Sequence, residues 1–185
     1  MTEAIDLLPL HEWEGFYVIV GTSAAALTGL MFVVIAVAAD AGPRAVGPRG
    51  IATFVTPTIV HFCVALLISA IVSAPWPEHL GPQISLIAVG VGGFIYSLAV
   101  LRRTRSVTNY TMVLEDWLWH IVFPLLAYLV TASAGLVLEI QTTLGLFLIG
   151  GAAVLLVFIG IHNAWDTVTH LTLQRLKREQ EKPDS

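Results

Sequence analysis

The feature that most constrains this chain is a series of long apolar segments that carry almost no charge. A segment of about 20 largely apolar residues is long enough to cross the roughly 30 Å hydrocarbon core of a bilayer. Such segments fold as helices, because in lipid every backbone amide must be bonded within its own segment. The sequence therefore predicts an all-α, polytopic membrane bundle. Its five transmembrane helices are expected at residues 16–39, 51–74, 83–101, 117–138 and 142–165.

Composition agrees with this fold class. Of the 185 residues, 56% are apolar and only 12% are charged, whereas soluble domains carry about 25% charged residues. These values exclude a disordered chain, a basic nucleic-acid binder and an ordinary cytosolic enzyme. No linker sets off a soluble domain, so we expect residues 1–185 to form one membrane domain, with residues 166–180 as a cytoplasmic helical extension. There is no phosphate-binding loop or dinucleotide fingerprint, so neither nucleotides nor nucleic acids are expected partners.

The distribution of charge predicts the orientation of the bundle. With five spans, the N-terminus and the loops at residues 75–82 and 139–141 lie on one side of the membrane and contain no Lys or Arg. The other side holds all nine basic residues: Arg44, Arg49, Arg102, Arg103, Arg105, Arg175, Lys177, Arg178 and Lys182. Because basic residues accumulate on the cytoplasmic side, we expect the N-terminus outside and the C-terminus in the cytoplasm. The expected location is the cytoplasmic (plasma) membrane of a bacterium, with membrane lipids as partners.

Small residues recur in the first and third spans. Gly21, Ala25 and Gly29 are four residues apart, so they lie on one helical face. Small residues let membrane helices approach closely. This face is either ordinary packing within one chain or a subunit interface. Five spans make a thin bundle, so we favour a homo-oligomer. The glycines at residues 90–93 are interpreted as close helix packing rather than as an ion filter.

The second span contains a histidine far from either end. His61 lies ten residues, or about 15 Å, after the predicted start at Ile51. Pro57 cannot donate a backbone hydrogen bond and is expected to kink this span. An ionisable group at mid-depth is a functional hypothesis by default. The alternative is a neutral histidine that fixes the packing of two helices.

The densest group of polar residues lies at the cytoplasmic ends of the last two spans. Asp116 and His120 are four residues apart on one helix, and His162, Asn163 and Asp166 lie together on the next. Only residues 139–141 separate these two spans, so they are antiparallel neighbours and the two groups lie at similar depth.

Three roles are open for this group. His120, His162, Asp116 and Asp166 carry the donor types that bind Zn, Fe or Mn. A histidine beside a carboxylate also suits a proton relay. The third role is structural, because membrane interfaces collect such residues as anchors and caps. No cofactor is required by the sequence, and a divalent metal is the only one it suggests.

The leading functional hypothesis is an oligomeric, channel-like or transport protein for a proton, an ion or a small solute. His61 would lie on the path, and the mouth would be formed by Asp116, His120, His162, Asn163 and Asp166. The alternatives are a metal-dependent membrane enzyme that uses this cluster on a lipid or quinone-like substrate, and an accessory subunit without chemistry. No catalytic residue is assigned.

Overall fold

The computed structural model describes residues 10–40, 55–78, 80–105 and 114–180. Within these ranges it is helical: α1 (Leu10–Asp40), α3 (Thr56–Ser73), α4 (Leu80–Arg105), α5 (Leu114–Trp117), the π-helical turn η2 (Leu118–Val122), α6 (Phe123–Ile140) and α7 (Thr142–Gln180). Five helices are long and apolar enough to cross a membrane, which fits an integral membrane protein: Glu12–Ala36, Thr56–Ser73, Leu80–Arg103, Leu118–Ile140 and Thr142–His170. The prediction of an all-α chain with five such helices is confirmed in these ranges.

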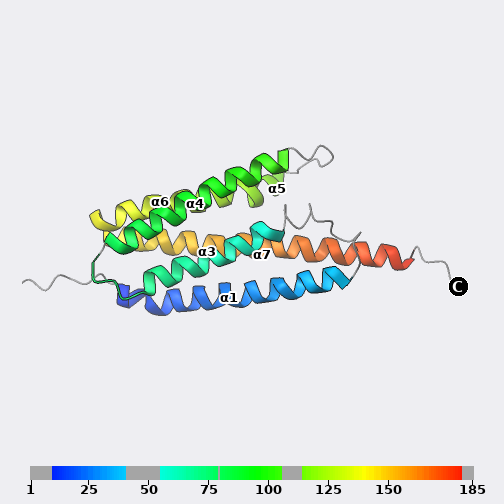
Figure 1. Cartoon of the computed structure of the whole chain (residues 1–185), viewed down its shortest axis with the longest axis horizontal. Helices are drawn as coiled ribbons and strands as arrows, with labels where there is room; N and C mark the ends of the chain where they lie inside the picture. Colours follow the sequence, from blue (N-terminus) through cyan, green and yellow to red (C-terminus); the bar gives the residue numbers. More distant parts are fainter. Residues whose placement is uncertain (1–9, 41–54, 79, 106–113, 181–185) are drawn as a thin grey trace, which may run out of the picture.

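The helices run antiparallel in sequence order (Figure 1). We call the end where α1, α4 and α7 finish the basic end, because Arg102 and Arg103 lie there at the end of α4. The opposite end is called the acidic end, because Glu12 begins α1 and Glu139 lies near the end of α6. The basic residues Arg44, Arg49 and Lys182 are outside the described residues.

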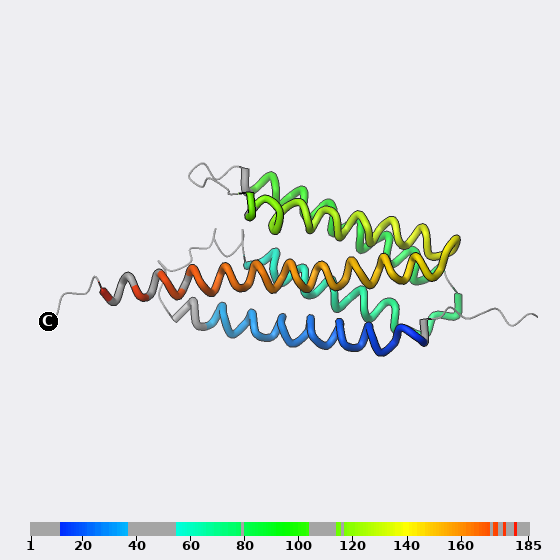
Figure 2. The backbone as a smooth tube through the Cα atoms, turned by 180° about the vertical axis from the view of Figure 1, so that it is seen from behind, coloured from blue at the N-terminus to red at the C-terminus, as the bar shows by residue number. Residues whose placement is uncertain are grey.

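The long helix α7 lies in the middle of the bundle (Figures 1 and 2). It packs chiefly against α6 and α3 and also contacts α1. The other two extensive interfaces are the pairs α4–α6 and α1–α3, whereas α3 and α4 touch over a short stretch only. The bundle is therefore two helix pairs joined through α7.

Glycines allow the α4–α6 pair to approach closely, as the sequence predicts for residues 90–93. A Cβ on Gly90 would lie 2.7 Å from the Cβ of Ala132, and one on Gly93 would overlap the Tyr128 ring. α6 also contributes a glycine to this interface, because a Cβ on Gly135 would lie 2.8 Å from Ile87 Cγ1 of α4. Small residues on both helices thus bring the two backbones together, as is common between membrane helices.

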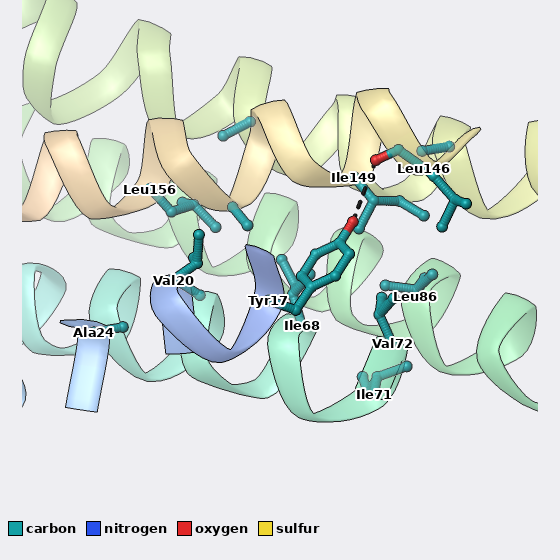
Figure 3. Packing of buried hydrophobic residues seen from close by; sticks show 14 of the residues in the cluster. Tyr17, Val20, Ala24, Ile68, Ile71, Val72, Leu86, Leu146, Ile149 and Leu156 are labelled. Atoms are coloured by element: carbon teal, nitrogen blue, oxygen red, sulfur yellow. Dashed lines mark hydrogen bonds between the residues drawn. The ribbon is translucent and has the colours of Figure 1, made fainter. Parts of the chain in front are cut away.

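The half of the bundle nearer the acidic end has an apolar core. Figure 3 shows Tyr17 of α1 reaching into this core, where its hydroxyl donates to the Leu146 carbonyl of α7 at 3.2 Å. Fully buried aliphatic side chains surround it, among them Ile68, Leu86, Leu146 and Ile149. The phenol has its polar end satisfied by a helix carbonyl, so this core holds no free donor at that point.

Large apolar side chains also cover the outside of the helices. Ile19, Ile95 and Leu136 are more than 60% exposed, and they lie on three different helices, α1, α4 and α6. A water-soluble protein rarely exposes such side chains on every face. Exposure of this kind is what contact with lipid requires.

Candidate functional site

The site begins at a buried histidine–tyrosine pair between α3 and α6. His61 is 2% exposed and Tyr128 is fully buried. His61 Nδ1 lies 2.9 Å from the Tyr128 hydroxyl, and the direction of this hydrogen bond depends on the imidazole tautomer. His61 is thus a polar group deep in an apolar bundle whose partner is another proton-carrying side chain.

Three local features place Tyr128 against His61. The missing side chain of Gly93 leaves room on α4 for the tyrosine ring. Side chains lean toward the N-terminus of their helix, and α6 begins at the basic end, so Tyr128 leans toward that end. His61 lies five residues after Thr56, the first residue of α3, which is roughly 8 Å along the axis.

The described part of α3 begins at Thr56, with Pro57 in its first turn and Val55 in a helical conformation before it. His61 therefore lies in the half of the described helix nearer the basic end. Residues 51–54 are outside the described residues, so the predicted start of this span at Ile51 and the predicted kink at Pro57 stay predictions.

A second part of the site lies where α5 and η2 meet α7. His162 Nε2 is 3.3 Å from Asp166 Oδ2 and 3.8 Å from Glu115 Oε1. The Trp119 ring stacks on His162, with 4.1 Å between centroids and 16° between planes. The His162 side chain is 22% exposed, while Glu115 and Asp166 are 70% and 46% exposed. These residues form the exposed outer part of the site.

Asn163 lies next to this outer part but points inward. It is 1% exposed, and both its amide nitrogen and its amide oxygen are buried with no hydrogen-bond partner among the described residues. Its depth follows from a contact one turn earlier on α7, where a Cβ on Gly160 would overlap the ring of Phe62. Asn163 therefore lies close to the level of Thr58, one turn from His61.

The π-helical turn explains how α6 presents two aromatic rings to α7. Pro124 has no N–H to bond the His120 carbonyl, which is its acceptor in a regular helix. The chain instead makes a wider turn, in which the Phe123 N–H bonds the Leu118 carbonyl five residues back. One extra residue in the turn rotates Trp119 and His120 relative to α6. Such turns are frequent at functional sites.

His120 lies level with Asn163. Gly145 of α7 abuts Leu138 of α6, with 2.9 Å from a Cβ to Leu138 Cα. Eighteen residues from this contact toward the basic end stand Asn163 on α7 and His120 on η2. The stacking of Trp119 on His162 agrees with this register. The Nδ1 atom of His120 is buried.

The structure brings together part of the predicted cluster. His162 and Asp166 are in contact, and Trp119, the neighbour of His120 in sequence, stacks on His162. Asn163 follows His162 on α7. The side chain of Asp116 is outside the described residues. Sequence analysis missed Glu115, Trp119 and Tyr128. The sequence contained a signal for Glu115 and Trp119, because both stand in the polar and aromatic stretch Glu115–His120. The signal for Tyr128 was its position, since it is the tyrosine nearest the middle of a predicted span.

The predicted metal site stays a prediction. Among the residues that the structure describes, no group of three or more His, Cys, Asp or Glu side chains is arranged to hold a metal ion. Asp116, one of the four predicted ligands, is not among the side chains described. The remaining three are His120, His162 and Asp166.

The predicted helix-packing face of α1 divides between two environments. Gly21 is buried, and a Cβ there would lie 2.9 Å from the Ser69 Cβ of α3. Ala25 and Gly29 are exposed, and nothing lies within 4 Å of a Cβ built on Gly29. Gly21 therefore serves packing within the chain, while Ala25 and Gly29 remain open to lipid or to a second copy.

Comparison with known proteins finds no matching family model, no similar curated protein and no similar solved structure.

Proposed function

We propose that the protein is a small transport or channel-like protein that handles protons, and that it works as a homo-oligomer in a bacterial plasma membrane with its basic end in the cytoplasm. The observation that carries this proposal is the buried His61–Tyr128 hydrogen bond. An ionisable side chain this deep among membrane helices is costly, and such groups commonly belong to ion pathways or proton relays.

The chemistry of the site favours a proton over a metal cation or a larger solute. Its members are imidazoles, a phenol and carboxylates, which all give up and accept protons. A proton needs only a series of hydrogen-bonded groups, whereas a permanent cation needs several oxygen ligands to replace its hydration shell. The polar side chains of this site form such a series. His162, with Asp166 beside it, stands at its exposed end, and His61 with Tyr128 stands at its buried end.

Among the described residues, this series of polar side chains reaches the surface at the basic end. Beyond Tyr128 the core is mostly aliphatic, with side chains such as Ile68 and Leu146. The Tyr17 hydroxyl there bonds the Leu146 carbonyl. The buried hydroxyls of Ser69 and Thr131 there donate to carbonyls of their own helices. In this proposal the proton is loaded from the basic end, and its release on the other side requires a second conformation or the neighbouring subunit.

Reconstitution into liposomes tests the proposal. Vesicles with a pH-sensitive dye inside are given a potassium diffusion potential, and proton entry is followed by fluorescence. Wild-type protein is expected to conduct protons above the rate of empty vesicles. Tyr128→Phe removes only the hydroxyl that meets His61 and is expected to lower the flux at least tenfold.

Tyr17→Phe provides a matched control. It makes the same substitution at a tyrosine that is also buried, but whose hydroxyl bonds the Leu146 carbonyl in the apolar half. This variant is expected to keep the wild-type flux. Equal flux through both variants would contradict a path through His61 and Tyr128, and wild-type flux no higher than that of empty vesicles would contradict proton transport.

A metal-dependent membrane enzyme is the alternative. One observation favours it, namely the two carboxylates within 4 Å of His162 Nε2. Elemental analysis of the purified protein distinguishes the two functions. A stoichiometric transition metal that is lost in His162→Ala would support the enzyme, and a protein free of metal that still conducts protons would support the transporter.

A further inference from the structure

The amide of Asn163 is a buried polar group of the site that lacks the hydrogen bonds its burial calls for. Its side chain is 1% exposed, and neither its nitrogen nor its oxygen has a hydrogen-bond partner among the described residues. A buried amide without partners is destabilising, because it has given up its hydrogen bonds to water and gained none in return. Buried polar groups in proteins are therefore bonded to protein or to ordered water in nearly all cases.

Asn163 has polar groups on two sides, the exposed outer part of the site and the buried His61–Tyr128 pair. On its own helix the preceding residue is His162, which meets Asp166 and Glu115. On α3, the contact of Gly160 with Phe62 puts Thr58 close to the level of Asn163. Thr58 is fully buried, and His61 follows one turn later. On the η2 side, His120 lies at the same level. Asn163 thus stands between the outer carboxylates and the inner His61–Tyr128 pair.

We propose that Asn163 binds a water molecule that joins these two parts of the site into one proton pathway. This inference rests on the proposed function and names the ligand that completes it. The amide offers one acceptor, Oδ1, and donors on Nδ2. Water is the smallest ligand that uses both kinds of group, and buried waters typically make about three hydrogen bonds to such otherwise unsatisfied atoms.

Asn163 is a positioning residue in this pathway, because an amide does not titrate. The water accepts a proton from the His162 side and releases a different proton toward His120 or His61, so its own composition is unchanged after each transfer. The Asn163 amide holds the oxygen in place while the two protons exchange. A carboxylate at this position would instead trap the proton.

Solid-state NMR of the protein in lipid bilayers tests for this water directly. The sequence contains two asparagines, Asn109 and Asn163, so selective ¹⁵N labelling of asparagine gives two side-chain amide signals. Asn163→Leu removes one of them and so assigns it. Magnetisation is then transferred from water protons to the Asn163 Nδ2 group. Its build-up is compared with that of the backbone amide of Leu156, which lies in the apolar core and is observed in a second sample labelled with ¹⁵N-leucine and assigned with Leu156→Ile.

The expected result is a build-up at Asn163 several times faster than at Leu156. Equal build-up at the two sites would overturn the inference. Stability gives a second readout, because an apolar side chain of similar size relieves an unsatisfied amide. If Asn163 binds no ligand, Asn163→Leu is expected to raise the melting temperature and leave the proton flux unchanged. If it binds water, the flux is expected to fall at least tenfold.

These measurements separate the inference from the proposed function. The water contact is detected without any transport, so a positive NMR result together with wild-type vesicles that do not conduct would overturn proton transport alone. Proton flux through wild-type protein without a water contact at Asn163 would overturn the inference alone.

Discussion

Two adjacent glycines of α4 offer a sharp test of the packing that holds Tyr128 in place. Gly93 is buried, and a Cβ there would lie 2.6 Å from Tyr128 Cγ and would overlap the ring. Gly92 is exposed, and nothing lies within 4 Å of a Cβ built on it. Both are interior residues of the same helix, so Gly93→Ala and Gly92→Ala differ in their surroundings and little else.

The expected difference follows from this geometry. Replacing glycine with alanine in a helix interior gains about 1 kcal/mol at either position, and this gain cancels in the comparison. At Gly93 the new methyl must reach an ordinary contact distance of about 3.5–4.0 Å from the ring. The ring or the helix therefore moves by about 1 Å. Such overpacking costs about 1–3 kcal/mol, so Gly93→Ala is expected to be less stable than Gly92→Ala by that amount.

Reversible unfolding in mixed micelles, followed by tryptophan fluorescence, measures the two free energies of unfolding. The same shift is expected to disturb the 2.9 Å contact between Tyr128 and His61. Gly93→Ala should therefore also conduct protons more slowly than Gly92→Ala. Equal stability of the two variants would refute the close approach of α4 to α6 at Tyr128, and with it the reason given for the position of that side chain.

Three further predictions concern orientation, assembly and the outer part of the site. A reporter fused after Ser185 is expected to be cytoplasmic and one at the N-terminus external, and a reporter assay with both on one side would contradict the five-span topology. Gly29→Leu is expected to weaken self-association in detergent, measured by light scattering, without unfolding the chain, whereas Gly21→Leu is expected to destabilise the monomer by clashing with α3. An unchanged oligomer in Gly29→Leu would assign this face to lipid. His162→Ala is expected to reduce proton flux more than His170→Ala, because His162 contacts two carboxylates and a tryptophan ring; equal loss in both would argue against His162 as the entry point.

The five long apolar helices were predictable, because the length and apolarity that allow a helix to cross a bilayer are visible in the sequence. The short connection between the last two helices was also predictable from the sequence. In the structure only Gln141 separates α6 from α7. The predicted start of the second span at Ile51 and the kink at Pro57 stay predictions, because residues 51–54 are outside the described residues. Proline fits the first turn of a helix as well as a kink, so its position alone does not fix where a helix starts.

The partners within the site were harder to predict, because sequence spacing fixes depth along a helix but not rotation about its axis. Depth placed His120, His162 and Asp166 at one end correctly. The π-helical turn before Pro124 adds a residue and changes which side chains face α7, so Trp119 became the ring stacked on His162. Tyr128 meets His61 only because Gly93 of a third helix leaves space, and no pattern within one helix contains that information.

The central place of α7 has a consequence for how the protein is made. This helix is the last of the five long helices to leave the ribosome, yet it is the one that joins the α1–α3 pair to the α4–α6 pair. A nascent chain that ends before Thr142 has the first four of these helices but lacks the surface on which the two pairs meet. Polar groups on α3 and α6 lack this cover until α7 has been made. The order of synthesis thus delays closure of the five-helix bundle until α7 has emerged.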